Sequence, residues 1–173
     1  MNTRGRLVLN AGLFQIGWLA CVFGAQQGWL LLIAIACLAA HVRWVAEDRN
    51  EWRSLVQVAV CGWILDCVLG YVGVFDFGDN HLLLPLWLAL LWLLFASTLR
   101  YSLRWTAQPW WMGSVLGACG GALSYFGGAK LAGVGLPLGL WPSLLLIAAI
   151  WALLFPLLHR VARSSIRFSD KGC

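Results

Sequence analysis

The sequence predicts an all-α fold, a polytopic bundle of six transmembrane helices that forms a single domain over residues 1–173. Three observations predict it. The chain is 61% hydrophobic and only 11% charged, whereas soluble domains carry about 25% charged residues. Its apolar residues form six stretches of roughly 20 residues, the length that crosses a hydrocarbon core of about 30 Å. Its charged residues collect in the short segments between those stretches.

The first three membrane spans are predicted at residues 7–25, 29–46 and 54–75. The polar turn at residues 26–28 separates the first span from the second. The charged segment at residues 47–53 separates the second span from the third. An acidic segment at residues 76–81 then closes the third span, so each boundary coincides with a polar interruption.

The last three spans are predicted at residues 83–103, 111–132 and 138–159. Pro85 lies in the first turn of the fourth span, where a proline removes no helical hydrogen bond. The fifth span begins after Pro109. The segment at residues 133–137 contains two glycines and a proline, and it separates the fifth span from the sixth.

The distribution of Lys and Arg predicts the orientation, because these residues favour cytoplasmic loops. With the N-terminus inside, eleven of the twelve Lys and Arg fall on the cytoplasmic side, and only Lys130 falls outside. Removing any one span would invert all later loops and destroy this asymmetry. The sequence therefore predicts that both termini are cytoplasmic. The net charge of +5 resides at span ends, a placement that excludes nucleic acid as a partner.

Asp66 is the strongest polar signal, because it lies near the middle of the third span, where a carboxylate is costly. Gly62 and Gly70 lie four residues to either side and share its helix face. Small residues at this spacing allow another helix to approach closely. Two interpretations stay open. Asp66 is either a functional acid (a proton carrier, an ion ligand or a general acid) or a structural carboxyl that joins two helices.

The fifth span is predicted to supply the partner of Asp66, and to be surrounded by other helices. It carries two rows of small residues at helical spacing, Gly113, Gly117 and Gly121 in one row and Gly120, Ser124 and Gly128 in the other. At 1.5 Å per residue, Asp66 lies roughly 18 Å, and Tyr125 roughly 20 Å, from the inner ends of their helices. We predict that Asp66 hydrogen-bonds near Ser124 or Tyr125. Lys130 lies about two turns further out and would reach Asp66 only by bending inward.

A second polar group is predicted at the cytoplasmic side, roughly 5–12 Å from the inner boundary. Its members are Asn10, Gln15, His41, Gln57, Ser97 and Thr98. They would either line a cavity that opens to the cytoplasm or form separate hydrogen bonds between helices. Further along, Arg160, Arg163 and Arg167 suit anionic lipid headgroups.

No metal site or cofactor is predicted. Asp76, Asp79 and His81 in the outer loop have ligand-like side chains, but their spacing matches no specific metal signature, and they are interpreted as solvated loop residues. The six cysteines form no CxxC pair, and those inside apolar spans are interpreted as small apolar residues.

The fourth and fifth spans resemble a family of small bacterial inner-membrane proteins classed as a domain of unknown function. The matching residues are Pro85-Leu86-Trp87, Trp92, Phe95, Thr98-Leu99, Ser102-Leu103, Trp105, Gly120 to Tyr125, Gly128 and Lys130-Leu131. Asn10 to Cys21 and the Asp66 region are also similar. This sequence has Ala122 where the family often has proline, and Lys130 where it often has arginine. The resemblance implies a place in the bacterial inner membrane, and a lipid-linked role because members tend to be encoded near cyclopropane-synthase-like enzymes.

Three hypotheses for function follow from the sequence. The first is a non-enzymatic membrane component that binds lipids and assists a lipid-modifying enzyme. The second is a small proton-coupled transporter that uses Asp66, which requires a wet cavity reaching that carboxylate. The third is an intramembrane lipid-modifying enzyme, which requires Asp66, Tyr125 and Lys130 to converge within hydrogen-bond reach. The sequence does not indicate an oligomeric state.

Overall fold

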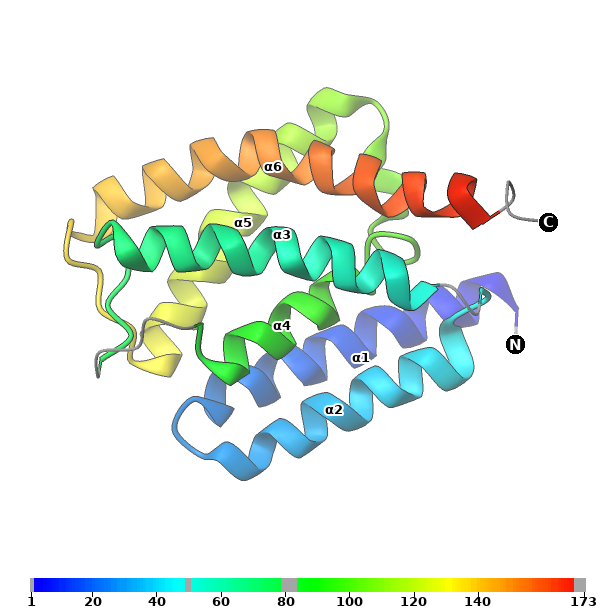
Figure 1. The fold of residues 1–173 in the computed structure, drawn as a ribbon, viewed down its shortest axis with the longest axis horizontal. Helices are drawn as coiled ribbons and strands as arrows, with labels where there is room; N and C mark the ends of the chain where they lie inside the picture. The colour runs from blue at the N-terminus through cyan, green and yellow to red at the C-terminus, as the bar shows by residue number, and fades with distance from the viewer. Residues whose placement is uncertain (1, 49–50, 79–83, 170–173) are drawn as a thin grey trace.

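The computed structural model describes residues 2–48, 51–78 and 84–169, with side chains described as far as residue 163. These residues form six α-helices and no β-strand (Figure 1). The helices are α1 (Thr3–Gly24), α2 (Leu31–Ala40), α3 (Glu51–Tyr71), α4 (Leu86–Ala96), α5 (Trp110–Ala132) and α6 (Leu140–Ser169). Three short helical segments join them, η1 (Gly28–Leu30), η2 (His41–Val45, a π-helical turn) and η3 (Arg104–Ala107). The prediction of an all-α fold is therefore confirmed.

Within the described residues, four helical segments are long and apolar enough to cross a membrane, judged by their length and composition. They are Thr3–Gly24, Gly28–Val45, Glu51–Tyr71 and Leu140–Arg163. Their sides expose large apolar residues at mid-helix, such as Ile64 at 61% and Leu153 at 72% exposed. Extended apolar surfaces of this kind are unusual in soluble monomers, so the helices are compatible with a membrane protein.

The fourth predicted span is wrong in its extent. The sequence indicated a helix through residue 103, but α4 ends at Ala96, which makes it only about 16 Å long. The chain continues in tight turns until η3. The hydroxyls of Ser97 and Thr98 donate to the carbonyls of Leu94 and Phe95, at 2.7 and 2.6 Å. Such local bonds from Ser and Thr compete with continuation of a helix.

The fifth predicted span has the expected bounds but a different composition from the four apolar segments. Helix α5 is 23 residues long, which is sufficient to cross a membrane. Its glycines, serines and Lys130 lower its mean hydropathy, so it does not belong with the four segments that are apolar enough. Length and composition alone therefore support four spans.

The helices pack as two groups joined by α3 and α4 (Figure 1). Helices α1, α2 and α4 pack together, and α6 packs on α3 and on α5. Helix α5 has its most extensive contact with α6 and exposes its opposite side, with Leu123 at 68% exposed. The expectation that neighbours surround α5 on all sides is therefore wrong.

The first glycine row of α5 serves the contact with α6. A Cβ atom at Gly117 would lie 2.7 Å from the Trp151 carbonyl oxygen, and a Cβ at Gly121 would overlap the Trp151 indole. Gly113 lies in the same row, but its Cβ position is nearest the Thr106 carbonyl oxygen of η3, at 3.0 Å, with Pro156 and Phe155 of α6 further away. Close approach of two helices through small residues is the usual packing mode in membranes. The prediction of such a contact is thus correct for α5, but its partner is α6.

The glycine face around Asp66 has a different neighbour from the one expected. A Cβ atom at Gly62 would overlap the Trp92 indole of α4, and one at Gly70 would lie 3.1 Å from the Phe77 ring. The face therefore accommodates aromatic side chains and does not receive the backbone of α5. Gly128, expected in helix packing, has no atom within 4 Å of its Cβ position.

We expect Gly117→Ala to lower the free energy of unfolding by about 1–3 kcal/mol, because the added methyl group overpacks the α5–α6 contact. The obstacle is backbone and a Cβ atom, so side-chain rotation cannot relieve it. Gly120→Ala is the matched control, since nothing lies within 4 Å of its Cβ position. It should be neutral or stabilising by up to about 1 kcal/mol. Unfolding by SDS titration in detergent micelles measures both, and equal effects would contradict the packing assignment.

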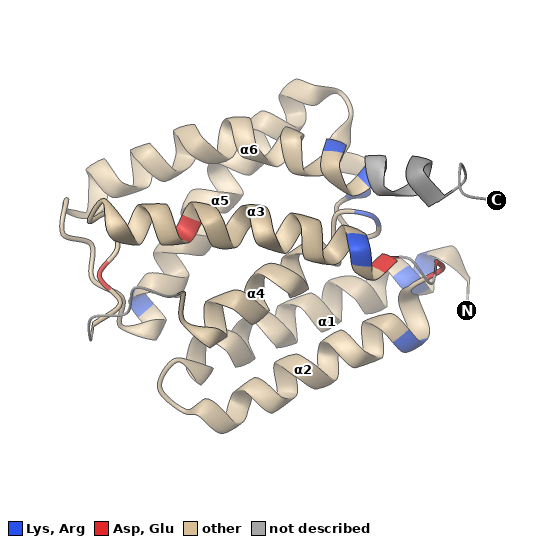
Figure 2. Ribbon diagram, in the orientation of Figure 1, with Lys and Arg blue, Asp and Glu red and all other residues tan. Residues whose placement is uncertain are grey.

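The charged residues are distributed as the sequence indicated. Among the described residues, Lys and Arg gather at one end of the bundle, where α1 begins and the described side chains of α6 end (Figure 2). We call this the basic end. Lys130 lies in the last turn of α5, at the opposite end.

Candidate functional site

Asp66 joins three helices inside the bundle. Its side chain is fully buried, and each carboxylate oxygen accepts one hydrogen bond. The Tyr125 hydroxyl of α5 donates to Oδ1, and the Trp92 indole Nε1 of α4 donates to Oδ2, both at 2.6 Å. Hydrogen bonds to an ionised acceptor are among the strongest in proteins. The predicted pairing of Asp66 with the Ser124–Tyr125 region is therefore confirmed at Tyr125.

The other two residues expected near Asp66 have different neighbours. The Ser124 hydroxyl accepts a hydrogen bond from Nε1 of Trp18 on α1, at 3.1 Å. Lys130 is exposed, with its Nζ 5.7 Å from the centroid of the Phe126 ring. Lys130 thus does not bend inward to Asp66, because its side chain has a nearer aromatic neighbour and access to the surface.

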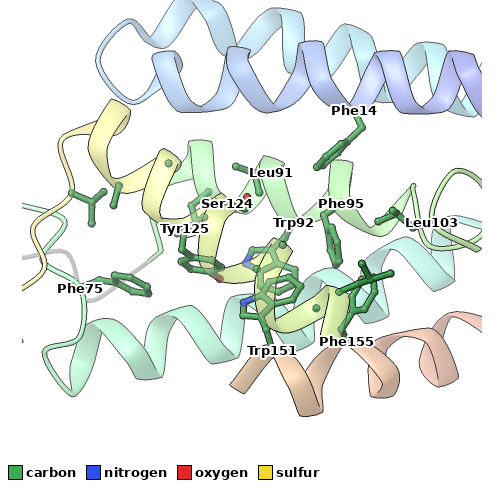
Figure 3. A pocket seen from close by; sticks show the side chains of 18 of the residues that line it. Phe14, Phe75, Leu91, Trp92, Phe95, Leu103, Ser124, Tyr125, Trp151 and Phe155 are labelled. Carbon is green, nitrogen blue, oxygen red and sulfur yellow. The ribbon is translucent and has the colours of Figure 1, made fainter. Parts of the chain in front are cut away.

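A cavity of about 330 Å³ lies between α4 and α5 (Figure 3). Residues of α6, one residue of α1, η3 and the segments that follow α3, α4 and α5 complete its wall. We call it the aromatic cavity. Ten of its lining residues are aromatic, namely Phe14, Phe75, Phe77, Trp87, Trp92, Phe95, Trp105, Tyr125, Trp151 and Phe155. The second row of α5, Gly120, Ser124 and Gly128, forms the opposite wall with Gly117 and Gly121. Nothing lies within 4 Å of the Cβ positions of Gly120 and Gly128, so the absence of side chains on these two glycines leaves space open.

Aromatic stacking fixes the walls of the aromatic cavity. The rings of Trp92 and Trp151 stack with centroids 5.6 Å apart, and Tyr125 stacks on Phe75 at 5.4 Å. Stacked and edge-to-face ring pairs stabilise by about 0.5–1.5 kcal/mol beyond burial. Asp66 does not line the cavity. It lies behind Trp92 and Tyr125, and its two hydrogen bonds hold these side chains in the cavity wall.

This geometry limits the chemistry available to Asp66. Both carboxylate oxygens already accept hydrogen bonds, and the carboxylate has no exposed surface. The wall in front of it is aromatic. Since Lys130 lies elsewhere, the constellation of Asp66, Tyr125 and Lys130 does not assemble.

A second buried polar cluster lies at the basic end and centres on Asn10. The Asn10 amide nitrogen donates to the Ser97 carbonyl at 3.2 Å, and its Oδ1 accepts from the Ser102 N–H at 3.2 Å and hydroxyl at 2.6 Å. The Ser97 carbonyl and the Ser102 N–H are backbone groups of the turns that follow α4. Irregular backbone at membrane depth is tolerated only where its polar groups are satisfied inside the protein. Asn10 thus supplies partners where α4 ends early.

His41 and Glu51 extend this cluster. The backbone partners fix the orientation of the Asn10 amide, so its nitrogen also donates to Nδ1 of His41 at 3.2 Å. His41 therefore donates from Nε2 to Glu51 Oε1, at 2.9 Å. The other oxygen of Glu51 accepts from the Tyr101 hydroxyl at 2.6 Å, and that hydroxyl accepts from the backbone N–H of Glu47. The Glu47 carboxylate in turn pairs with Arg6.

The sequence missed Glu51, which it placed in a charged loop at residues 47–53. Glu51 is only 2% exposed, because α3 begins at this residue and turns its side chain toward His41. An acidic residue in the first turn of a helix is favoured by the helix dipole. That position was the one sequence signal that separated Glu51 from its charged neighbours.

The predicted cytoplasmic-side group is only partly assembled. Asn10 and His41 come together, and the Ser97 backbone joins them. Gln15 and Gln57 are exposed, and the Thr98 hydroxyl donates within its own turn. These residues therefore do not share a cavity, and the alternative of hydrogen bonds between helices is the one that the structure supports for Asn10 and His41.

No group of three or more His, Cys, Asp or Glu within residues 2–48, 51–78 and 84–163 is arranged to hold a metal ion. The outer-loop residues Asp79 and His81 lie outside the described residues. Asp76 accepts from the Gly78 N–H at 2.9 Å, and its backbone pairs with Gly135. Asp76 is thus used in loop structure.

The described helices define an all-α protein whose four long apolar segments are compatible with a membrane protein. The chain belongs to the family described as Protein of unknown function (DUF2878), whose model matches residues 7–157. This match spans most of the chain and agrees with the resemblance to a family of unknown function. No curated protein and no solved structure matches the chain.

Proposed function

We propose that the protein is a multi-pass component of the bacterial inner membrane that binds a lipid hydrocarbon chain in the aromatic cavity. The cavity is the observation that carries the proposal. Its volume of about 330 Å³ falls in the range of ligand pockets, about 300–1,000 Å³. An apolar wall of this kind favours a hydrocarbon chain over a polar solute. In this proposal the protein is non-enzymatic and assists a lipid-modifying enzyme.

The rim of the aromatic cavity supports entry from the surrounding lipid. Trp105 and Leu116 line the cavity and are also 61% and 37% exposed. Gly120 is exposed as well, with no neighbour at its Cβ position. A lipid chain therefore has an apolar route between η3 and α5. Three hydroxyl-bearing residues line the wall, Thr106, Ser124 and Tyr125, and each hydroxyl is engaged in a hydrogen bond.

The proposed orientation places the basic end in the cytoplasm, with both termini inside and six membrane crossings. Short loops rich in Lys and Arg stay on the cytoplasmic side. Helix α4 crosses together with the buried turns that follow it, in which Leu99 and Thr106 are each 2% exposed. A cysteine at Gln108, which is exposed and precedes α5, and one at Leu138, labelled in separate intact-cell experiments by a membrane-impermeant maleimide, test this orientation. Labelling of position 138 alone is expected, and labelling of position 108 alone would show the opposite orientation.

We expect Gly120→Leu to reduce lipid retention about tenfold, because its side chain would occupy the aromatic cavity. The change corresponds to about 1.4 kcal/mol of binding free energy. Native mass spectrometry of the purified protein, with titrated phospholipid, measures it. Gly12→Leu is the matched control, since Gly12 is an exposed glycine on α1 with open space at its Cβ position. Equal retention by both variants would exclude the cavity as the lipid site.

The proposed partner, a lipid-modifying enzyme, rests on the family resemblance and has its own test. Crosslinking in membranes followed by purification should recover one such enzyme in stoichiometric amount. Recovery of the protein without a lipid-modifying enzyme would refute the accessory role but would not affect the proposal that the protein binds lipid. The alternatives, a proton-coupled transporter and an intramembrane lipid-modifying enzyme, both require Asp66 to exchange a proton, and the Asp66 variants in the Discussion separate them from this proposal.

A further inference from the structure

A second pocket lies at the basic end, between the segment that leads into α5 and the last described turns of α6. Its polar lining comprises Gln108, Trp110, His159, Arg160 and Arg163. We call it the basic pocket. None of its lining residues is acidic, so the two guanidinium groups have no carboxylate within the pocket. A pocket of this composition favours an anion, and arginine pairs with phosphate through two parallel hydrogen bonds.

The basic pocket and the aromatic cavity lie next to each other along the same two segments. Trp105 and Thr106 line the aromatic cavity, and Gln108 lines the basic pocket. On α6, Phe155 lines the cavity, and Arg160 lines the pocket. These two positions are five apart in sequence, a rise along the helix of roughly 7.5 Å. A glycerol ester linkage between a fatty acyl chain and a phosphate spans such a distance.

The boundary between the two spaces is one buried hydrogen bond. Thr106, which lines the cavity, and His159, which lines the pocket, are 2.9 Å apart at Oγ1 and Nε2. The Thr106 hydroxyl donates its single proton to the Leu103 carbonyl at 2.7 Å, so His159 donates to Thr106. Polarity thus rises in order from an aromatic wall through a hydroxyl and an imidazole to two guanidinium groups.

We propose that the basic pocket binds the phosphate of an anionic phospholipid whose acyl chain lies in the aromatic cavity. This assignment rests on the proposed function, because it adds a headgroup site to the chain site. The order of polarity from the aromatic cavity to the basic pocket matches the order of hydrocarbon, ester and phosphate in one phospholipid molecule. Trp110, at 69% exposed, lies at the rim of the pocket, where indole rings favour the membrane interface.

The test compares phosphatidylglycerol with phosphatidylcholine of identical acyl chains, titrated onto the purified full-length protein and read by native mass spectrometry. The unmodified protein should retain phosphatidylglycerol at least about tenfold better. The double variant Arg160→Gln/Arg163→Gln should lose this preference. The matched control, Arg43→Gln/Arg53→Gln, removes the same charge from two exposed arginines outside the pocket, and it should keep the preference. Equal loss in both double variants would overturn the inference, because general attraction to the basic end would then explain it.

Two further arms identify the source of the phosphate and separate this inference from the proposed function. Glycerol 3-phosphate and inorganic phosphate should not displace the phospholipid at a hundredfold excess, and displacement by either would overturn the lipid assignment. In the same assay, Gly120→Leu should weaken both lipids equally. If Gly120→Leu lowers lipid retention but Arg160→Gln/Arg163→Gln keeps the preference for phosphatidylglycerol, the headgroup site is refuted and the chain site is retained. Unchanged lipid retention in Gly120→Leu would refute the chain site itself.

Discussion

Asp66→Leu is expected to lower the free energy of unfolding by about 2–6 kcal/mol. Leucine has no acceptor, so the buried Trp92 N–H and the Tyr125 O–H would both lose their partner. Each buried polar group left unsatisfied costs about 1–3 kcal/mol. Because these side chains form part of the cavity wall, lipid retention should fall together with stability. SDS titration in detergent micelles measures the free energy of unfolding, and native mass spectrometry measures lipid retention.

Asp66→Asn separates a structural carboxylate from one that carries protons. The amide oxygen can accept from Trp92, and the amide nitrogen can donate to the Tyr125 oxygen, so both neighbours keep a hydrogen bond. We expect stability within about 1 kcal/mol of the unmodified protein and unchanged lipid retention. If the Asp66→Asn variant folds but loses a proton-coupled transport or lipid-modification activity that the unmodified protein shows in vesicles, the structural role is refuted. That outcome would favour one of the two alternatives.

Asn10→Leu is expected to have the second large effect, again about 2–6 kcal/mol of unfolding free energy. The substitution removes the partners of the Ser97 carbonyl and the Ser102 N–H, at about 1–3 kcal/mol for each stranded group. It also removes the donor to His41. The turns after α4 should loosen, and hydrogen exchange should become faster at residues 97–103 while the amides of α6 stay protected.

Gln15→Leu provides the control on the same helix. Gln15 is exposed, so the replacement by leucine should change stability by less than about 0.5 kcal/mol. If Asn10→Leu and Gln15→Leu behave alike, then the polar cluster at the basic end does not support the early end of α4.

The two carboxylates of α3 show how much of the polar interior the sequence revealed. Asp66 was identifiable because a lone carboxylate within an apolar stretch has to be satisfied by the protein, and helix rise placed it near the depth of Tyr125. Glu51 receives the same kind of partners, a ring N–H and a tyrosine hydroxyl. It went unrecognised because a charged residue near a span end is ordinarily solvated.

Helix α4 shows the limit of apolar patterning. Hydrophobic residues continue through residue 103, so the sequence indicates one full span. The helix ends at Ala96 because other groups satisfy its last carbonyls. The Ser97 and Thr98 hydroxyls donate to the carbonyls of the final turn, and the Asn10 amide donates to the Ser97 carbonyl in the turns that follow. A partner 87 residues away in sequence leaves no local trace, since periodicity reports only on neighbouring positions.

The sequence by itself determined the all-α class, the approximate bounds of five helices, the gathering of Lys and Arg at one end and the pairing of Asp66 with the Ser124–Tyr125 region. These properties depend on composition and on rise per residue, which are local. The tertiary structure alone decided which helix each glycine row contacts, that Lys130 lies apart from Asp66, and that α4 and α5 leave an aromatic cavity between them. These properties depend on how side chains from distant segments fill shared space, because shape complementarity is a property of pairs of surfaces.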